Sequence, residues 1–281
     1  MSPLILIVTS CFLFSVLAGI IKFTSQFIHP VEQAFFRNII SIIFFIPFLI
    51  SKKITLRKKA NFNLLILRSI FGGITMILLF WSYSLIPLSQ VMAISFSTPL
   101  FIYFGSIIFL NEKNSPKKTL IMFLGFIFTI IIIRPDLEVK FGTVLALIAA
   151  LTHAIAGLLV KKLSKDENVL TLMFSMIVLM SPITLLPSVY VWETPDNLKI
   201  ISLLFMIAVI ATLGNYCWTK AISLSSLTNI MPFDFSKLIF ATILGLFFFN
   251  ERIDIITVIF GSGLIICNTY IAGKIKKNAE F

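Results

Sequence analysis

Long apolar stretches alternate with short polar segments along the whole 281-residue chain. An apolar stretch of about 18 residues or more with few charges is typical of a helix that spans a membrane. Ten such stretches cover residues 4–22, 31–50, 64–86, 88–110, 119–134, 142–160, 169–190, 200–220, 226–249 and 253–273. The pattern therefore predicts an all-α integral membrane protein with ten transmembrane helices and no room for a soluble domain.

The composition agrees with this pattern and orients the loops. Of all residues, 58% are hydrophobic and 12% charged, whereas soluble chains are about one-quarter charged. The net charge of +11 does not indicate a nucleic-acid partner here, because basic residues collect in the cytoplasmic loops of membrane proteins. Of the 23 Lys and Arg residues, fifteen flank the spans on one side, five of them within residues 51–63, and five lie on the other side. We therefore expect both termini in the cytoplasm.

The sequence contains an internal repeat. Residues 83–112 align without a gap on residues 222–251, and ten of the thirty aligned positions are identical, including Asn-Glu at the end of both segments. The repeat pairs the fourth span with the ninth, and a separation of five spans inverts the second copy relative to the first. Inverted repeats underlie many secondary transporters, whose substrate site lies at mid-membrane between the halves. We therefore expect two five-helix repeats, residues 1–136 and 137–281.

Several short motifs resemble one transporter family. They are "FFRN" at 35–38, "SFSTPLF" at 95–101, "FLNE" at 109–112, "PFDFSKL" at 232–238 and "FFNE" at 248–251. Together with the ten-span pattern they resemble the drug/metabolite transporter superfamily, EamA type. The "PFDF" segment resembles a narrower branch that includes S-adenosylmethionine uptake and riboflavin transporters.

The resemblance implies a ten-helix basket around a central cavity in a bacterial inner membrane. It also implies transport by alternating access without ATP hydrolysis, and the chain has no phosphate-binding loop of the G-x-x-x-x-G-K-[ST] type. We expect a small polar organic substrate, of which a zwitterion such as S-adenosylmethionine or an amino acid is one candidate. A riboflavin-, vitamin- or nucleoside-type carrier and an exporter of metabolites or drugs stay open. No cofactor is expected, and the direction of transport, the coupling proton or ion and the oligomeric state stay open.

Two charges in the ninth span are the leading candidates for the substrate site. Asp234 and Lys237 lie near the middle of the span, and their i, i+3 spacing places them on one helix face. A charge at this depth costs at least about 2.5–3.5 kcal/mol and normally faces the bundle interior or a wet cavity. The repeat places Ser95 and Thr98 at the corresponding positions of the fourth span. The pair is interpreted either as a substrate site or as a structural ion pair that locks the fold.

Other polar and aromatic residues within spans are weaker candidates. Arg37 is a candidate for anion binding or gating, or for a structural bond to a loop or to Glu32, and Arg68 is expected to extend to the cytoplasmic surface. His153 is interpreted as a proton relay or as a polar packing residue. Candidates that stack on or bond a flat substrate, or else serve packing or interfacial anchoring, are Asn215, Tyr103, Trp81 and Trp218.

Two prolines are candidate hinges, and two Asn-Glu pairs are candidates for a gate or for fixing a loop. Pro99 and Pro232 interrupt the fourth and ninth spans and are candidate hinges, because interrupted helices in matching segments point to a transporter's site. The Asn-Glu pairs that end these spans are candidates for a gate or for fixing a loop; they are Asn111, Glu112, Asn250 and Glu251.

Two other classes of protein fit the sequence less well. A membrane enzyme is disfavoured because the chain has no H-E-x-x-H or G-x-S-x-G motif. A passive channel usually repeats a selectivity element around a symmetric pore, whereas here one charged pair occurs in one half. The cysteines, Cys11, Cys217 and Cys267, have no metal-ligand spacing and are interpreted as small apolar filler. The expected partners are therefore a small molecule and the lipid bilayer.

Overall fold

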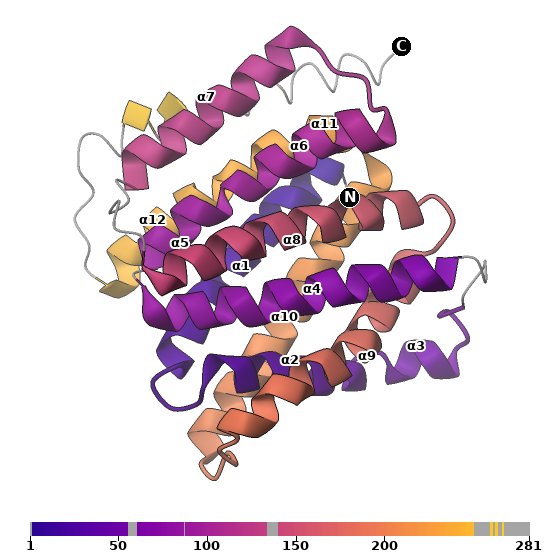
Figure 1. The fold of residues 1–281 in the computed structure, drawn as a ribbon, viewed down its shortest axis with the longest axis vertical. Coiled ribbons are helices and arrows are strands. Elements are labelled where there is room, and N and C mark those ends of the chain that lie inside the picture. The colour runs from indigo at the N-terminus through magenta and orange to yellow at the C-terminus, as the bar shows by residue number, and fades with distance from the viewer. Residues whose placement is uncertain are drawn as a thin grey trace.

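A computed structural model describes residues 2–55, 61–86, 88–133 and 140–249, together with residues 259, 260, 262, 263 and 266. These residues form helices and no strands, which confirms the all-α prediction. The helices are α1 (Pro3–Thr24), α2 (Pro30–Ile43), α3 (Ile46–Ile50), α4 (Phe62–Leu85), α5 (Leu88–Ser95), α6 (Ser97–Leu110), α7 (Pro116–Ile133), α8 (Phe141–Leu163), α9 (Val169–Ser188), α10 (Leu198–Leu224), α11 (Leu227–Ile230) and α12 (Ser236–Phe249). Two 3₁₀ helices, η2 (Val189–Val191) and η3 (Met231–Phe235), extend α9 and join α11 to α12. Figure 1 labels the α-helices on the ribbon.

Five helices in the described residues are long and apolar enough to cross a membrane: α1, α4, α8, α9 with η2, and α10. Three of the other predicted spans occur as helices in pieces. The second is divided into α2 and α3, the fourth into α5 and α6, and the ninth into α11, η3 and α12. Of the tenth predicted span, 253–273, only the five residues named above fall within the described part of the chain.

Polar caps mark the start of three of the long helices, α1, α9 and α10. The Ser2 side chain accepts a hydrogen bond from the amide of Leu4 at the start of α1, and the Asn168 side chain accepts one from Thr171 at the start of α9. These caps satisfy amide groups that have no partner inside the helix. Pro30 opens α2, a position where the missing amide hydrogen costs nothing.

The helix boundaries follow the offset of the sequence repeat, in which residue 222 aligns with residue 83, 139 positions earlier. Helices α2 and α9 begin at residues 30 and 169, and α4 and α10 end at 85 and 224. Helices α5 and α11 begin at 88 and 227, and α6 and α12 begin at 97 and 236. The backbone is therefore divided at the same places in both halves.

Two lysines at the same offset make equivalent contacts. The ammonium of Lys22 donates to the carbonyls of Tyr83 and Ile86 at the end of α4. The ammonium of Lys161 donates to the carbonyls of Ile222 and Ser225 at the end of α10, at 2.8 and 2.7 Å. Carbonyls at a helix end lack partners within the helix. Each half therefore uses a lysine from its first long helix to satisfy the end of a later one.

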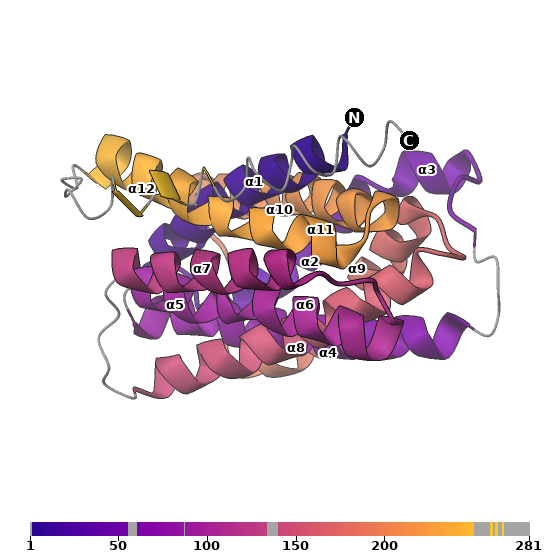
Figure 2. The ribbon, with the colours of Figure 1, turned by 90° about the horizontal axis from the view of Figure 1, so that it is seen from above.

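The packing of the long helices is also paired. Helix α1 lies along α10, and its counterpart α8 lies along α4; α2 packs on α9. Helix α1 also contacts α12, and α8 contacts α6. Figure 1 shows α7 at one edge of the bundle and α2 with α9 at the opposite edge, and Figure 2 shows α1, α10 and α12 on one side with α4, α6 and α8 on the other. Every one of these contacts has its equivalent when the halves are exchanged.

The buried apolar side chains gather in two large clusters. One includes Phe96, Trp218 and Phe235, and the other includes Met76 and Phe80. Residues of both clusters line one shared cavity. The candidate site described next therefore lies where the two cores meet.

Candidate functional site

A cavity of about 190 Å³ lies inside the bundle and is lined by side chains from both halves of the chain. Most of its wall is apolar, with a group of methionines that includes Met76, Met92, Met176 and Met180. Eight of the ten residues predicted as substrate contacts line it: Arg37, Ser95, Thr98, His153, Asn215, Trp218, Asp234 and Lys237. A largely apolar cavity with a few convergent polar groups is the usual form of a small-molecule site.

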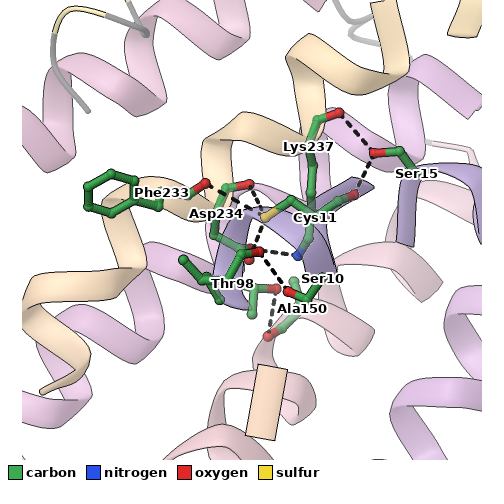
Figure 3. Close-up of polar contacts among 9 residues, drawn as sticks. Ser10, Cys11, Ser15, Thr98, Ala150, Phe233, Asp234 and Lys237 are labelled. Atoms are coloured by element: carbon green, nitrogen blue, oxygen red, sulfur yellow. Dashed lines mark hydrogen bonds and ion pairs between the residues drawn. The ribbon is translucent and has the colours of Figure 1, made fainter. Parts of the chain in front are cut away.

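Asp234 and Lys237 form an ion pair at the break in the ninth span. The Lys237 ammonium lies 2.7 Å from Oδ2 of Asp234 (Figure 3). Asp234 is in η3, and a 3₁₀ turn brings side chains three residues apart into line. The Asp234 side chain is 7% exposed and that of Lys237 is 21% exposed. The pair is therefore closed in this structure, and the greater exposure belongs to the lysine.

Helix α1 supports this pair from one side. The Cys11 thiol lies 3.8 Å from Oδ1 of Asp234 and 3.7 Å from the carbonyl oxygen of Phe233. The Ser15 hydroxyl donates to the carbonyl of Lys237 at 3.0 Å. Figure 3 shows Cys11 and Ser15 beside the pair. The sequence interpretation of Cys11 as apolar filler therefore misses its contact with Asp234; the one available signal is that Cys11 and Ser15 share a face of α1 at i, i+4.

The corresponding segment of the first half carries hydroxyl groups instead of charges. Thr98, in the first turn of α6, donates to the carbonyl of Ala150 at 3.2 Å (Figure 3). The hydroxyl oxygen of Ser95 is buried and has no hydrogen-bond partner among the residues that the structure describes. Both residues line the same cavity as Asp234 and Lys237. The cavity is therefore bounded by the two equivalent breaks.

Two buried arginines complete the polar wall. Arg37 donates to Oδ1 of Asn38 at 2.9 Å, and no contact with Glu32 is formed. Arg68 donates to the carbonyl of Leu172 at 2.8 Å. The expectation that Arg68 extends to the cytoplasmic surface is wrong, because this residue is 4% exposed and lines the cavity. Its position one turn into a span suggested the surface, whereas packing of α4 against α8 and α9 places it inside.

An imidazole and an indole lie together on another part of the wall. The ring centroids of His153 and Trp218 are 5.4 Å apart with an interplanar angle of 36°. This contact fits the interpretation of His153 as a packing residue, and its role as a proton relay stays a prediction. Asn215 donates to the carbonyl of Ala211 at 2.7 Å, and its side chain lines the cavity.

Two predicted contacts lie away from this cavity. Tyr103 is fully buried, and its hydroxyl bonds the side chains of Asn114, between α6 and α7, and of Thr119, in the first turn of α7. Trp81 packs edge-on against His29 and Phe141. We therefore leave Tyr103 and Trp81 out of the proposed site, because their contacts fix neighbouring segments.

The two candidate hinge prolines sit at the breaks in different ways. Pro99 lies in the first turn of α6, just after the interruption at Phe96. The first four amides of a helix have no partner within it, so a proline is tolerated there. Pro232 lies inside η3 and separates α11 from α12. Their action as hinges stays a prediction.

The Asn-Glu pair at the end of α6 holds a neighbouring helix. Asn111 has φ of 52° and ends α6 in the left-handed region, which asparagine adopts more readily than most residues. The Glu112 carboxylate accepts hydrogen bonds from the amides of Leu227 and Thr228 at 3.0 and 2.9 Å. These contacts favour the loop-fixing interpretation. Asn250 and Glu251 lie outside the described residues.

The described residues contain no group of three or more His, Cys, Asp or Glu side chains placed to hold a metal ion. The polar groups of the cavity are instead those that bind organic molecules: guanidinium, ammonium, carboxylate, hydroxyl and amide.

Comparison with known proteins relates this chain to membrane transporters. The model of the EamA-like transporter family matches it twice, at residues 1–134 and 140–273. An S-adenosylmethionine uptake transporter of Rickettsia bellii is 29% identical over 239 residues, covering 83% of this chain and 80% of the relative. A riboflavin transporter of Brucella anthropi is 27% identical over 75% of this chain and 77% of its own.

An exporter is among the similar proteins as well. A pseudopaline exporter of Pseudomonas aeruginosa is 23% identical over 98% of this chain and 97% of the relative. One protein of known crystal structure has 12% sequence identity and a TM-score of 0.80, with 99% of each chain covered. This last similarity concerns the fold alone.

Proposed function

The chain belongs to the EamA-like transporter family, and on that premise we propose that it is a secondary transporter of a small polar organic metabolite. It is a multi-pass protein of a bacterial membrane, and its relatives are transporters rather than enzymes. The proposal adds that transport proceeds by alternating access across the inner membrane. It also adds that the cavity around Asp234 and Lys237 is the substrate site.

The observation that carries the proposal is the ion pair on the cavity wall. Burial of two charges is costly, and a buried pair replaced by apolar residues of similar volume is often as stable or more stable. A pair that is retained in the cavity therefore favours a functional role. A polar substrate that replaces part of the Asp234–Lys237 contact can bind at little net cost and can leave again.

The equivalence of the two halves supports alternating access. The breaks, the helix ends and the lysine contacts of Lys22 and Lys161 recur at the same offset. We propose that residues 1–136 and 137–281 are two inverted five-helix repeats, with both termini in the cytoplasm. Two near-equivalent halves can adopt two near-equivalent states, each open to one side of the membrane.

The substrate class rests on the relatives and on the wall chemistry. The relatives include carriers named for S-adenosylmethionine and for riboflavin, and both are polar organic molecules with a flat ring system. We propose a molecule of this kind or an amino acid. Because both uptake proteins and an exporter are similar to this chain, the direction of transport is not part of the proposal.

Counterflow in proteoliposomes tests the proposed function. Vesicles loaded with one candidate substrate take up the labelled compound faster than empty vesicles if the protein is a carrier, and the uptake saturates. A passive channel gives neither trans-stimulation nor saturation. The candidates are S-adenosylmethionine, riboflavin, amino acids and nucleosides, first ranked by thermal stabilisation of the purified protein. Uptake that is linear in concentration and indifferent to internal substrate would contradict the proposal.

A further inference from the structure

The charged residues on the cavity wall do not cancel. Asp234 and Lys237 form a neutral pair. Arg37 and Arg68 are each 4% exposed and line the same cavity. Neither arginine has a carboxylate partner in the part of the chain that the structure describes. The described wall therefore carries two positive charges that nothing on the wall compensates.

Uncompensated guanidinium groups are costly at these positions. Arginine stays protonated in proteins, so burial cannot be relieved by loss of the proton. Two like charges that line one cavity also repel each other. The helix boundaries of the second half follow those of the first at an offset of 139 residues, and at this offset Arg37 and Arg68 correspond to the apolar residues Met176 and Ile207. Among the described residues, the unpaired positive charges of the wall therefore belong to the first half alone.

Both guanidinium groups keep donors for a ligand. Arg37 uses Nη1 for Oδ1 of Asn38, and Asn38 is itself held by donating to the hydroxyl of Thr184 at 3.2 Å. Arg68 uses Nη1 for the carbonyl of Leu172. No other oxygen within the described ranges accepts a hydrogen bond from either group. The remaining N–H groups suit an oxyanion, which a guanidinium binds through parallel hydrogen bonds.

We infer that, within the proposed class of small polar metabolites, the substrate is a member with net negative charge at neutral pH, and that its carboxylate or phosphate group binds Arg37 and Arg68. The inference rests on the proposed function, because it treats the cavity as the substrate site. It divides the site into two parts. The oxyanion group is held by α2 and α4 of the first half, and the remaining polar groups face Asp234 and Lys237 of the second half. The methionines and Trp218 line the space for the less polar body of the molecule.

Small oxyanions test this assignment without knowledge of the natural substrate. The purified protein in lipid nanodiscs is titrated with acetate, succinate and phosphate at constant ionic strength, with acetamide and chloride as uncharged and monatomic controls. We expect at least one oxyanion to raise the unfolding temperature while acetamide and chloride do not. A larger rise in unfolding temperature with succinate than with phosphate would indicate a preference for carboxylates, and the reverse would indicate a preference for phosphate. Equal effects of all five probes would overturn the inference.

Matched pairs of larger compounds extend the test to the substrate class. Glutamate and glutamine differ by one carboxylate charge, and riboflavin 5′-phosphate and riboflavin differ by a phosphate. A lost hydrogen-bonded charge contact weakens binding about tenfold or more, so in at least one pair we expect the anionic member to bind about tenfold tighter. Tighter binding of the neutral member in both pairs would overturn the inference. So would tighter binding of S-adenosylmethionine, a net cation, than of any of the anionic compounds.

Arginine variants show whether these residues hold the anion. Arg37→Gln and Arg68→Gln should each weaken oxyanion binding about tenfold. Because each removes a buried uncompensated charge, the unfolding temperature without anions should stay equal or rise. Arg68→Lys keeps the charge and should retain part of the affinity, and Lys162→Gln, at an exposed position on α8, should change neither quantity. A lower unfolding temperature with unchanged oxyanion affinity would assign the arginines a structural role instead.

The same measurements separate this inference from the proposed function. Counterflow of an uncharged or cationic compound, without oxyanion binding, would leave the carrier intact and remove the anion subsite. Oxyanion binding that depends on Arg37 and Arg68, without counterflow of any bound compound, would leave the subsite intact and contradict the carrier.

Discussion

The junction of α5 and α6 and the segment from α11 to α12 occupy the same place in the two halves, yet they carry different chemistry. Both interrupt a helix 139 residues apart, and both border the cavity. The first presents the hydroxyls of Ser95 and Thr98, whereas the second presents the ion pair of Asp234 and Lys237. The backbone thus repeats while the side chains diverge. Under the proposed alternating access, the repeated backbone would supply two equivalent states, and the unequal side chains would orient one substrate between them.

The arginines extend this contrast to the rest of the wall. Arg37 and Arg68 come from the first half, and the residues 139 positions later, Met176 and Ile207, are apolar. Of these two, Met176 lines the cavity. The first half therefore contributes a net positive charge to the cavity and the second contributes a neutral pair. The predictions below change one half and use the other as reference.

Removal of one member of the ion pair should have the largest effect. If the pair is part of the substrate site, Asp234→Asn or Lys237→Met should lower transport about a hundredfold or more, because a buried charged contact is worth at least about 2–5 kcal/mol. The protein should still insert and fold. Uptake in proteoliposomes at matched protein levels measures the loss of transport. Ser95→Ala, at the position of the first half that corresponds to Asp234, is the variant with which these two are compared.

The double variant distinguishes a substrate site from a structural lock. In a lock, each single variant leaves one charge unpaired, costs about 3–5 kcal/mol of stability and expresses poorly. Asp234→Asn with Lys237→Met would then recover both folding and transport. Full transport by the double variant would remove the pair from the substrate site.

An intermediate and equal effect is expected for the two lysines that hold helix ends. Lys22→Met and Lys161→Met each leave two carbonyls without their donor. The loss should be about 1–3 kcal/mol in each case. Thermal unfolding in lipid nanodiscs measures it, and Lys162→Met, exposed and next to Lys161, should shift stability by about 0.5 kcal/mol or less. A large effect of one lysine and none of the other would contradict the equivalence of the halves.

The smallest effect on stability should come from Ser95→Ala. The Ser95 hydroxyl is buried without a partner among the described residues, so its removal should leave the free energy of unfolding unchanged or raise it by up to about 1 kcal/mol. Thr98→Val, which removes the donor to Ala150, should instead lower it by about 0.5–1.5 kcal/mol. Destabilisation by Ser95→Ala of the same size as by Thr98→Val would show that Ser95 is bonded in the folded protein.

The structure confirms the sequence predictions whose cause is local. The long apolar stretches match α1, α4, α8, α9 and α10, because the length of an apolar stretch is a property of the chain itself. The prolines and the repeat predict the breaks that the structure shows near Phe96 and Pro232. The i, i+3 spacing of Asp234 and Lys237 likewise predicted a shared face, since it depends on one turn of backbone.

Sequence reasoning was weaker where a residue's environment depends on other helices. The position of Arg68 along its span predicts exposure at the cytoplasmic surface, whereas packing of α4 against α9 places the side chain inside the bundle. Cys11 lies 222 residues or more from the groups it contacts. Tyr103, like the residues that line the cavity, has a polar side-chain group within an apolar span. Its hydroxyl nevertheless bonds Asn114, away from the cavity.

The sequence by itself determined that this chain is a helical membrane protein built on a repeat, because apolar run length and the repeat offset act along the chain. Its short motifs, through their resemblance to the EamA type, indicated a transporter. The tertiary structure decided which polar side chains share a cavity. A helix can rotate about its axis without any change in its own hydrogen bonds, so the choice of face comes only from packing against its neighbours. That packing brought Arg37, Arg68, His153 and the Asp234–Lys237 pair onto one wall.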